Sequence, residues 1–207
     1  MVRFWLPFAL ILMITFSVFM TLLSWRPYDN SAFGNLLPMP ADCPAPCWGG
    51  IRPGVTDSGG AIDLLQQHDW VAEIDIKPST PPDGGQLIWY WAKPVAPMID
   101  ETRPGVAGIH RGIVTWIQIP TTLALGDLWL AQGEPTMAVT RESVPSHNLV
   151  RHYMMYGEQS VQWRSAITCP WRLQNFWLAR LDLWLGTASM VEMPPYRRPT
   201  HTTCRNG

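Results

Sequence analysis

Histidine, serine and acidic side chains are the residues of this chain that could act as catalysts or metal ligands. The five histidines include no pair spaced i, i+4, and no acidic residue stands beside them in a metal-binding register. No G-x-S-x-G or S-x-x-K motif marks a serine as a nucleophile. Asp100 and Glu101 are adjacent carboxylates in a proline-flanked loop, where a solvated charge pair is the ordinary interpretation. The sequence therefore predicts no catalytic residue, no metal site and no cofactor.

Four cysteines are the residues with the clearest chemistry, because thiols of an exported chain form disulfides. Cys43 and Cys47 flank the segment Pro-Ala-Pro, and Cys169 and Cys204 lie further along the chain. Four cysteines allow three pairings. We favour Cys43–Cys47, which needs only a turn, and Cys169–Cys204, which would tie a proline-rich tail to the body. A zinc site made of all four thiolates is the rival, but the wide spacing is unlike that of zinc motifs.

Twelve tryptophans are the most unusual feature of the composition. Trp89 and Trp91 alternate with Tyr90, so both indoles point to the same side of a predicted strand. Exposed indoles stack on sugar rings, which makes this pair a candidate ligand platform. The buried face of a sheet is filled in the same way, and we favour the core interpretation for both residues.

The segment Phe4–Leu23 carries no charged residue and is long enough, at about 1.5 Å per residue, to span a bilayer as a helix. It is longer than the apolar core of a cleaved signal, and no small-residue cleavage site follows it. A lipid anchor is disfavoured because the first cysteine is Cys43. We therefore predict a transmembrane signal-anchor over residues 1–25, with a cleaved signal as the alternative. The protein is then a single-pass protein of the cell membrane whose bulk is extracytoplasmic.

Turn residues and periodicity organise the chain after this segment. Six prolines mark residues 26–55 as a spacer. Residues 56–120 form a first unit of one helix and three strands. These elements are expected at Asp57–His68, Val71–Ile76, Gln86–Trp91 and Ile113–Ile119.

Residues 121–193 form a second unit of the same kind, in which Gly133 and Pro135 end a helix over 125–132. Its strands are expected at Met137–Arg141, Val150–Tyr156 and Ser160–Ser165. The segment 173–185 fits both a helix and a strand, and we favour a strand that closes a second sheet. Residues 194–207 are predicted to be an irregular tail. The predicted fold class is thus α+β, with a transmembrane helix followed by two helix-plus-antiparallel-sheet units, and an internal duplication is left open.

The net charge of −1 hides an uneven distribution. Residues 27–139 contain 12 acidic and 5 basic residues, whereas residues 140–207 contain 4 acidic residues and 8 arginines. We favour charge pairing between the two portions, and a basic face in the second portion is the alternative. No basic run is longer than Arg197-Arg198, so a nucleic-acid partner is not expected.

Two short motifs flank the predicted helices. The turn Ile51-x-x-Gly54-x-Thr56 leads into the first helix, and Gly133-x-Pro135 ends the second. Both resemble motifs of the small lipoproteins of the outer-membrane β-barrel assembly machine, which share a helix-on-sheet arrangement with the β-lactamase-inhibitor fold. The resemblance implies a module that binds other proteins and catalyses nothing. The chain departs from the family because no cysteine directly follows the apolar segment.

We therefore expect a membrane-anchored, extracytoplasmic binding or scaffold module whose partners are the membrane and another envelope protein. A glycan- or peptidoglycan-binding protein that uses Trp89 and Trp91 is the first alternative, and an unrecognised enzyme is the second. A protein-binding module should show an exposed apolar patch on one sheet face, whereas a glycan-binding protein should show at least two solvent-facing indoles. An enzyme should show a deep pocket with converging titratable groups.

Overall fold

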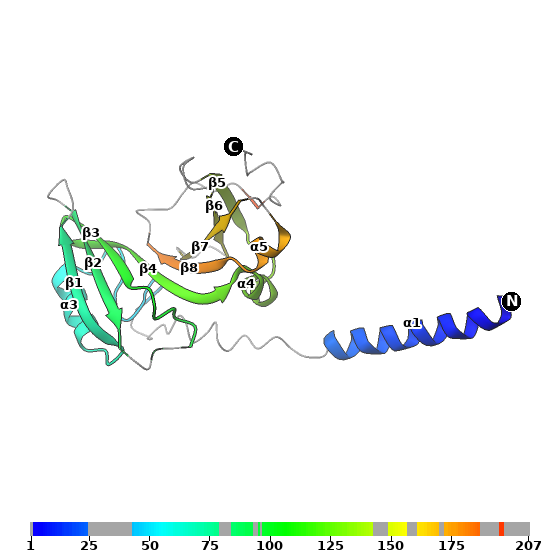
Figure 1. Cartoon of the computed structure of the whole chain (residues 1–207). Coiled ribbons are helices and arrows are strands. Elements are labelled where there is room, and N and C mark those ends of the chain that lie inside the picture. The colour runs from blue at the N-terminus through cyan, green and yellow to red at the C-terminus, as the bar shows by residue number, and fades with distance from the viewer. Residues whose placement is uncertain are drawn as a thin grey trace. The chain divides into compact units, whose positions relative to one another are not determined.

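The computed structural model of the chain describes residues 2–24, 43–78, 84–92, 95, 97–142, 149–156, 161–169, 172–186 and 195–196. Contacts between residues divide the chain into two compact units, Met1–Asn30 and Ser31–Gly207. Helix α1 belongs to the first unit, and the sheet and the other described helices belong to the second (Figure 1).

Helix α1 (Val2–Ser24) is the regular element of the first unit. The Thr15 hydroxyl donates to the carbonyl oxygen of Ile11 at 2.9 Å, so this polar group is satisfied within the helix. Across the part of the chain that the structure describes, none of the helices has the combination of length and apolar character that a membrane span requires. This finding overturns the predicted transmembrane signal-anchor over residues 1–25. The prediction depended on two properties of the segment, its length and its lack of charge.

The second unit contains a sheet of eight strands. Helices lie before its first strand, between the fourth and fifth strands, and between the seventh and eighth. In chain order the described elements are α3 (Ser58–Gln66), β1 (Val71–Pro78), β2 (Gly84–Trp91), β3 (Gly105–His110), β4 (Ile113–Ala124), α4 (Leu125–Gln132), β5 (Met137–Glu142), β6 (Leu149–Met155), β7 (Val161–Thr168), α5 (Leu173–Trp177) and β8 (Arg180–Leu185).

All neighbouring strands pair antiparallel, in the order β1-β2-β3-β4-β8-β7-β6-β5. Strand β8 is the link, because Leu183 lies opposite Ile119 of β4 on one side and opposite Trp163 of β7 on the other. The predicted fold class, with two separate sheets after a transmembrane helix, is therefore wrong. One continuous sheet forms because β8 pairs with both groups of strands, and hydrophobic periodicity does not reveal which strands become neighbours.

One face of the sheet packs against the helices and the other is turned away from them. Because side chains alternate along a strand, the register places Leu87, Ala107, Ile117 and Leu185 side by side on the helix-covered face. All four are almost completely buried. The helices complete this core with Ala61 and Leu65 of α3, Leu125 and Leu128 of α4, and Phe176 of α5. We term this side the core face and the opposite side the outer face.

Local sequence sets the start of α3. The carboxylate of Asp57 accepts a hydrogen bond from the amide of Gly60 at 2.9 Å, as an N-cap residue does. In the preceding turn, the Thr56 hydroxyl accepts from the Arg52 amide at 2.8 Å, and Gly54 has a φ of +83°. These contacts form the turn that leads into α3.

A disulfide closes the loop ahead of this turn. It joins Cys43 and Cys47, which confirms this predicted pairing. Cys169 is disulfide-bonded as well. Its predicted partner, Cys204, lies outside the described residues.

Strand β3 lies outside the three strands predicted for the first unit. Its Gly105 and Gly108 lack the side chains typical of a strand. Each instead makes room for an indole, because a Cβ atom there would lie 2.2 Å from Cε2 of Trp89 or 2.1 Å from Nε1 of Trp116. The ambiguous segment 173–185 contains both a helix, α5, and a strand, β8.

A row of polar side chains crosses the core face where β5, β6 and β7 pair. His152 lies opposite Thr140 on one side and opposite Ser165 on the other. Its Nδ1 is 2.9 Å from the Thr140 hydroxyl oxygen, and its ring packs on Phe176 with the ring centroids 5.6 Å apart. His152 is 1% exposed, and burial lowers its pKa to about 4. The imidazole is therefore neutral in the folded protein near neutral pH.

The burial of a neutral His152 predicts that the protein loses stability in mild acid. The unfolded chain binds a proton at this histidine below about pH 6.5, whereas the folded protein binds it only near pH 4. The free energy of unfolding should therefore be fully maintained above pH 6.5 and fall by ~3 kcal/mol as the pH decreases to about 4. Urea titrations should show this slope in the natural protein and not in a His152→Leu variant. A His110→Leu variant, which changes an exposed histidine of β3, should keep the slope, and equal slopes in all three proteins would contradict the prediction.

Candidate functional site

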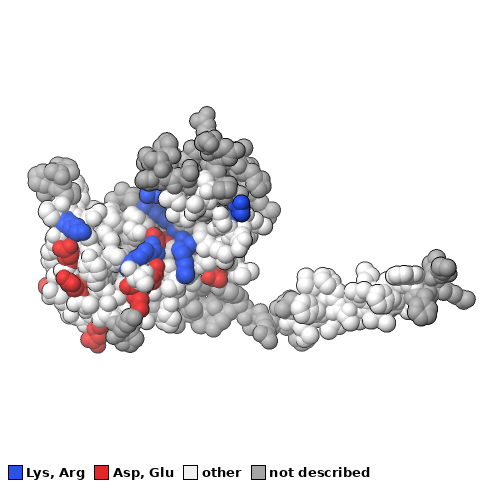
Figure 2. All heavy atoms as spheres, in the orientation of Figure 1, with Lys and Arg blue, Asp and Glu red and all other residues white. Residues whose placement is uncertain are grey.

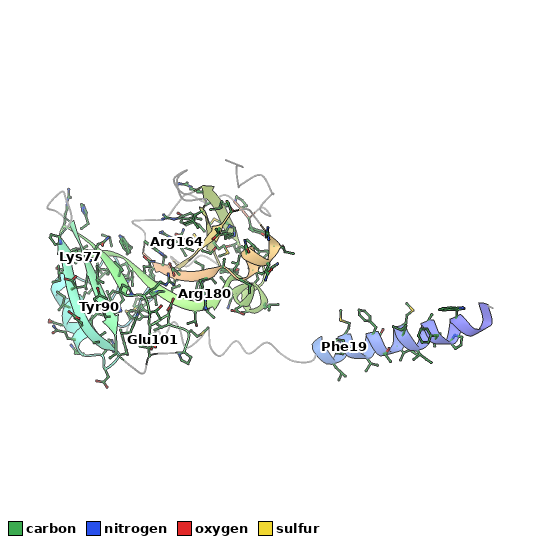
Figure 3. The ribbon with its side chains drawn as sticks, viewed as in Figure 1. Phe19, Lys77, Tyr90, Glu101, Arg164 and Arg180 are labelled. Carbon is green, nitrogen blue, oxygen red and sulfur yellow. A yellow bond between two sulfur atoms is a disulfide. The ribbon has the colours of Figure 1, made fainter. Side chains whose placement is uncertain are left out.

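The outer face carries polar and aromatic side chains at its centre, where β4, β8 and β7 pair. The register places Gln118 of β4 opposite Trp184 of β8, and Asp182 of β8 opposite Arg164 of β7. Tyr153 of β6 lies opposite Arg164 in the next pair of strands. Figure 3 shows Arg164 at this junction. Side chains from both groups of strands thus converge on one area.

Three side chains of this area, Arg164, Trp184 and Trp116, form what we term the arginine–tryptophan stack. The guanidinium carbon of Arg164 lies 3.4 Å from the ring centroid of Trp184. The ring centroids of Trp184 and Trp116 are 4.6 Å apart, and the two planes are inclined by only 25°. The Arg164 guanidinium also lies 5.2 Å from the ring centroid of Tyr153. Cation–π contacts contribute ~0.5–2 kcal/mol each, and here they hold the guanidinium in one orientation.

Gly108 of β3 makes the stack possible. The indole of Trp116 lies across this glycine, because a Cβ atom there would be 2.1 Å from the indole Nε1. One side of the indole is therefore against β3, and the other faces Trp184. Both tryptophans are half-buried in this arrangement.

Asp182 is the centre of a polar network beside the stack. Its carboxylate oxygens accept hydrogen bonds from Nη2 of Arg103 at 2.6 Å and from Nε2 of Gln118 at 2.9 Å. Arg103 also donates from Nε to Asp100 at 2.9 Å. Burial alone lowers the pKa of Arg103, but its contacts with Asp182 and Asp100 outweigh burial and raise the pKa above the usual value. Charge-assisted hydrogen bonds thus hold the loop before β3 against β8.

Arg164 keeps its charge although the side chain is half-buried. Its pKa is lowered to about 10, mainly by burial and also by the positive charge of Arg151, whereas Tyr153 and Asp182 act in the opposite direction. Its Nε donates to Oε1 of Gln162 at 2.5 Å. A pKa of about 10 still leaves the guanidinium protonated at neutral pH.

A partly open hollow of about 240 Å³ lies beside the stack on the outer face. The residues that line it include Gln118, Arg151, Tyr153, Arg164, Asp182 and Trp184. Small-molecule sites usually enclose ~300–1,000 Å³ and bury most of the ligand. This hollow is smaller, so it suits one side chain or a small anion better than a cofactor.

The predicted ligand platform, Trp89 and Trp91, lies on the core face. Trp89 is 0% and Trp91 is 9% exposed, and both pack on Trp48 with ring centroids 5.6 and 6.0 Å away. The Nε1 of Trp91 donates to the carbonyl oxygen of Arg103 at 2.7 Å. These values support the core interpretation of both tryptophans. Trp91 in addition fixes the loop that carries Arg103.

The arginine–tryptophan stack and Arg151 are absent from the residues that sequence reasoning singles out. A signal is nevertheless present in the sequence, because Arg151-x-Tyr153 and Gln162-x-Arg164 place polar groups on one side of two strands. Combined with the arginine excess of residues 140–207, this alternation would predict a basic sheet face. No sequence signal indicates that Trp116 belongs to the stack, because its position depends on Gly108 in another strand.

Substitution of Gly108 by alanine should disrupt the stack. The new Cβ atom would meet the Trp116 indole, so the ring must move relative to Trp184. Overpacking of this kind costs ~1–3 kcal/mol of stability. Near-UV circular dichroism should lose the signal of two coupled indoles, and thermal unfolding should occur at a lower temperature.

Val106→Ala is the matched control, because Val106 is on the same face of β3 and the substitution only removes atoms. This variant should retain the signal of the coupled indoles. A Gly108→Ala variant that also retains it would show that Trp116 does not lie across Gly108 in solution.

Comparisons with protein-family models, with curated proteins and with solved structures find no match to this chain. The resemblance to lipoproteins of the β-barrel assembly machine therefore stays a prediction. Support for a function comes from the geometry of the outer face.

Proposed function

We propose that this chain is a protein-binding module and that the outer face of its sheet is the binding surface. The observation that carries the proposal is the arginine–tryptophan stack, because Trp, Tyr and Arg contribute most of the binding energy at protein interfaces. The stack is ordered before any partner binds, since Trp116 lies against Gly108 and Arg164 lies against Trp184. Side chains that are ordered in advance lose little entropy on association.

A glycan-binding role has less support. Sugar rings stack on free indole faces. Trp184 lies between Arg164 and Trp116, and Trp116 lies between Trp184 and strand β3. Trp89 and Trp91 are buried in the core. None of these indoles offers a free face to a sugar.

An enzymatic role has less support still. His152, whose pKa is strongly lowered, lies on the core face and not beside the hollow. In the described part of the chain, no three His, Cys, Asp or Glu side chains gather closely enough to hold a metal ion. The cationic groups that line the hollow are arginines, which bind anions but do not transfer protons at neutral pH.

We further propose that the module acts outside the cytoplasm, with another envelope protein as its partner. Cys43 and Cys47 form a disulfide, and Cys169 is disulfide-bonded. Disulfides persist in exported proteins and are rare in the cytosol, which supports an oxidising compartment.

Site-specific photo-crosslinking in cells that produce the full chain tests the binding surface. A photoreactive phenylalanine analogue replaces Tyr90 or Ala166, which are both exposed on the outer face. The same analogue at Leu130 of α4 or Leu173 of α5, which are 71% and 68% exposed, provides the control. We expect the same discrete crosslinked protein from both outer-face positions and no such product from the control positions.

The dependence on position decides the outcome. Crosslinks that form only from Leu130 and Leu173 would place the partner on the helices and contradict the proposal. Products of equal yield from all four positions would indicate non-specific contact, which also contradicts it. The absence of any product from Tyr90 and Ala166 has the same consequence.

A further inference from the structure

Arginines are concentrated on the outer face of β5 to β8. Strand alternation places Arg141, Arg151, Arg164 and Arg180 there, one from each of β5, β6, β7 and β8. Arg141 lies directly opposite Arg151, and Arg151 and Arg164 both line the hollow. Like charges that face each other across strands destabilise a sheet. The protein therefore keeps these positive charges together at a cost, which points to an anion as their ligand.

Asp182 is the acidic side chain that lines the hollow, and it interacts with several side chains at once. It accepts hydrogen bonds from Arg103, in the loop before β3, and from Gln118 of β4. It also attracts Arg164, so this one carboxylate interacts with two cations, Arg103 and Arg164. Figure 2 shows Lys and Arg atoms over the middle of the second unit, with Asp and Glu atoms both beside them and towards β1.

We propose that the hollow receives a carboxylate side chain from an acidic segment of the partner protein, an inference that depends on the proposed function. Arg151 and Arg164 bind this carboxylate through charge-assisted hydrogen bonds, which are about twice as strong as neutral ones. Arg164 is stacked on Trp184, so its planar fork is oriented before the carboxylate arrives. A volume of about 240 Å³ holds one such side chain together with a few water molecules.

Charge elsewhere on the outer face selects a short acidic segment over a long polyanion. Glu73 and Asp75 of β1 are on this face, because they lie opposite Tyr90 and Ile88. Their carboxylates repel a phosphate backbone that runs across the sheet. A short acidic peptide segment avoids them by contacting only β6, β7 and β8.

Titration of the ¹⁵N-labelled full chain with a hexaglutamate peptide tests the proposal. The indole Nε1–H signals of Trp116 and Trp184 report on the stack and the hollow. We expect saturable shifts of both signals and weaker binding as salt is added. Arg151→Gln and Arg164→Gln should each weaken binding about tenfold or more, since each removes a charged hydrogen-bond donor.

Arg172→Gln is the matched control, because Arg172 is exposed at the start of α5 on the core side. This variant should bind the peptide as the natural protein does. Arg151 is exposed, so Arg151→Gln should fold normally even where Arg164→Gln disturbs the stack.

Three results would overturn the proposal: no saturable shift in the natural protein, unchanged affinity after either substitution at the hollow, or binding of an oligothymidylate as tight as that of the peptide. The last result would identify a nucleic acid as the ligand. If the peptide titration fails while crosslinks still form from Tyr90 and Ala166, the proposal of an acidic segment is wrong, but the outer face is still the binding surface. Loss of those crosslinks overturns the proposed function itself.

Discussion

The pairing of β8 with β4 is the contact on which the rest of the second unit depends. Without it, the eight strands would form two small sheets with twice as many exposed edges. With it, Trp184 of β8 lies beside Trp116 and Gln118 of β4, and Asp182 comes within reach of Arg103. Gln118 and Asp182 are 64 positions apart in the sequence, yet they share a hydrogen bond. The stack and its polar network therefore exist only in the joined sheet.

Strand β3 determines what each face of the sheet can hold. Gly105 leaves room for Trp89 on the core face, and Gly108 leaves room for Trp116 on the outer face. Each glycine costs ~1 kcal/mol in backbone entropy. Each indole buries up to ~150–250 Å², which contributes several kcal/mol and outweighs that cost. Trp91 connects the two faces, because its ring lies in the core while its Nε1 holds the loop that carries Arg103.

Signals between neighbours in the sequence predict local structure here, and contacts between distant residues explain what was missed. Asp57 caps the start of α3 and Gly133 follows the end of α4, so each signal lies beside the helix end that it marks. Strand β3 has no local signal, because its glycines serve indoles from other strands. The position of β8 depends in the same way on pairing with β4 and β7. The transmembrane prediction is wrong because none of the described helices combines the length and the apolar character of a membrane span.

The charge distribution along the chain shows why composition alone does not locate the candidate site. An acidic excess in residues 27–139 and an arginine excess in residues 140–207 favour ion pairs from acids of the first portion to arginines of the second. The ion pair between Arg103 and Asp182 has the opposite sense, because its base comes from the acidic portion and its acid from the basic one. This ion pair involves none of the arginines of β5 to β8. It neutralises Asp182, the acidic residue that lines the hollow together with Arg151 and Arg164. Sheet topology, and not net charge, thus makes these arginines a surface that attracts an anion.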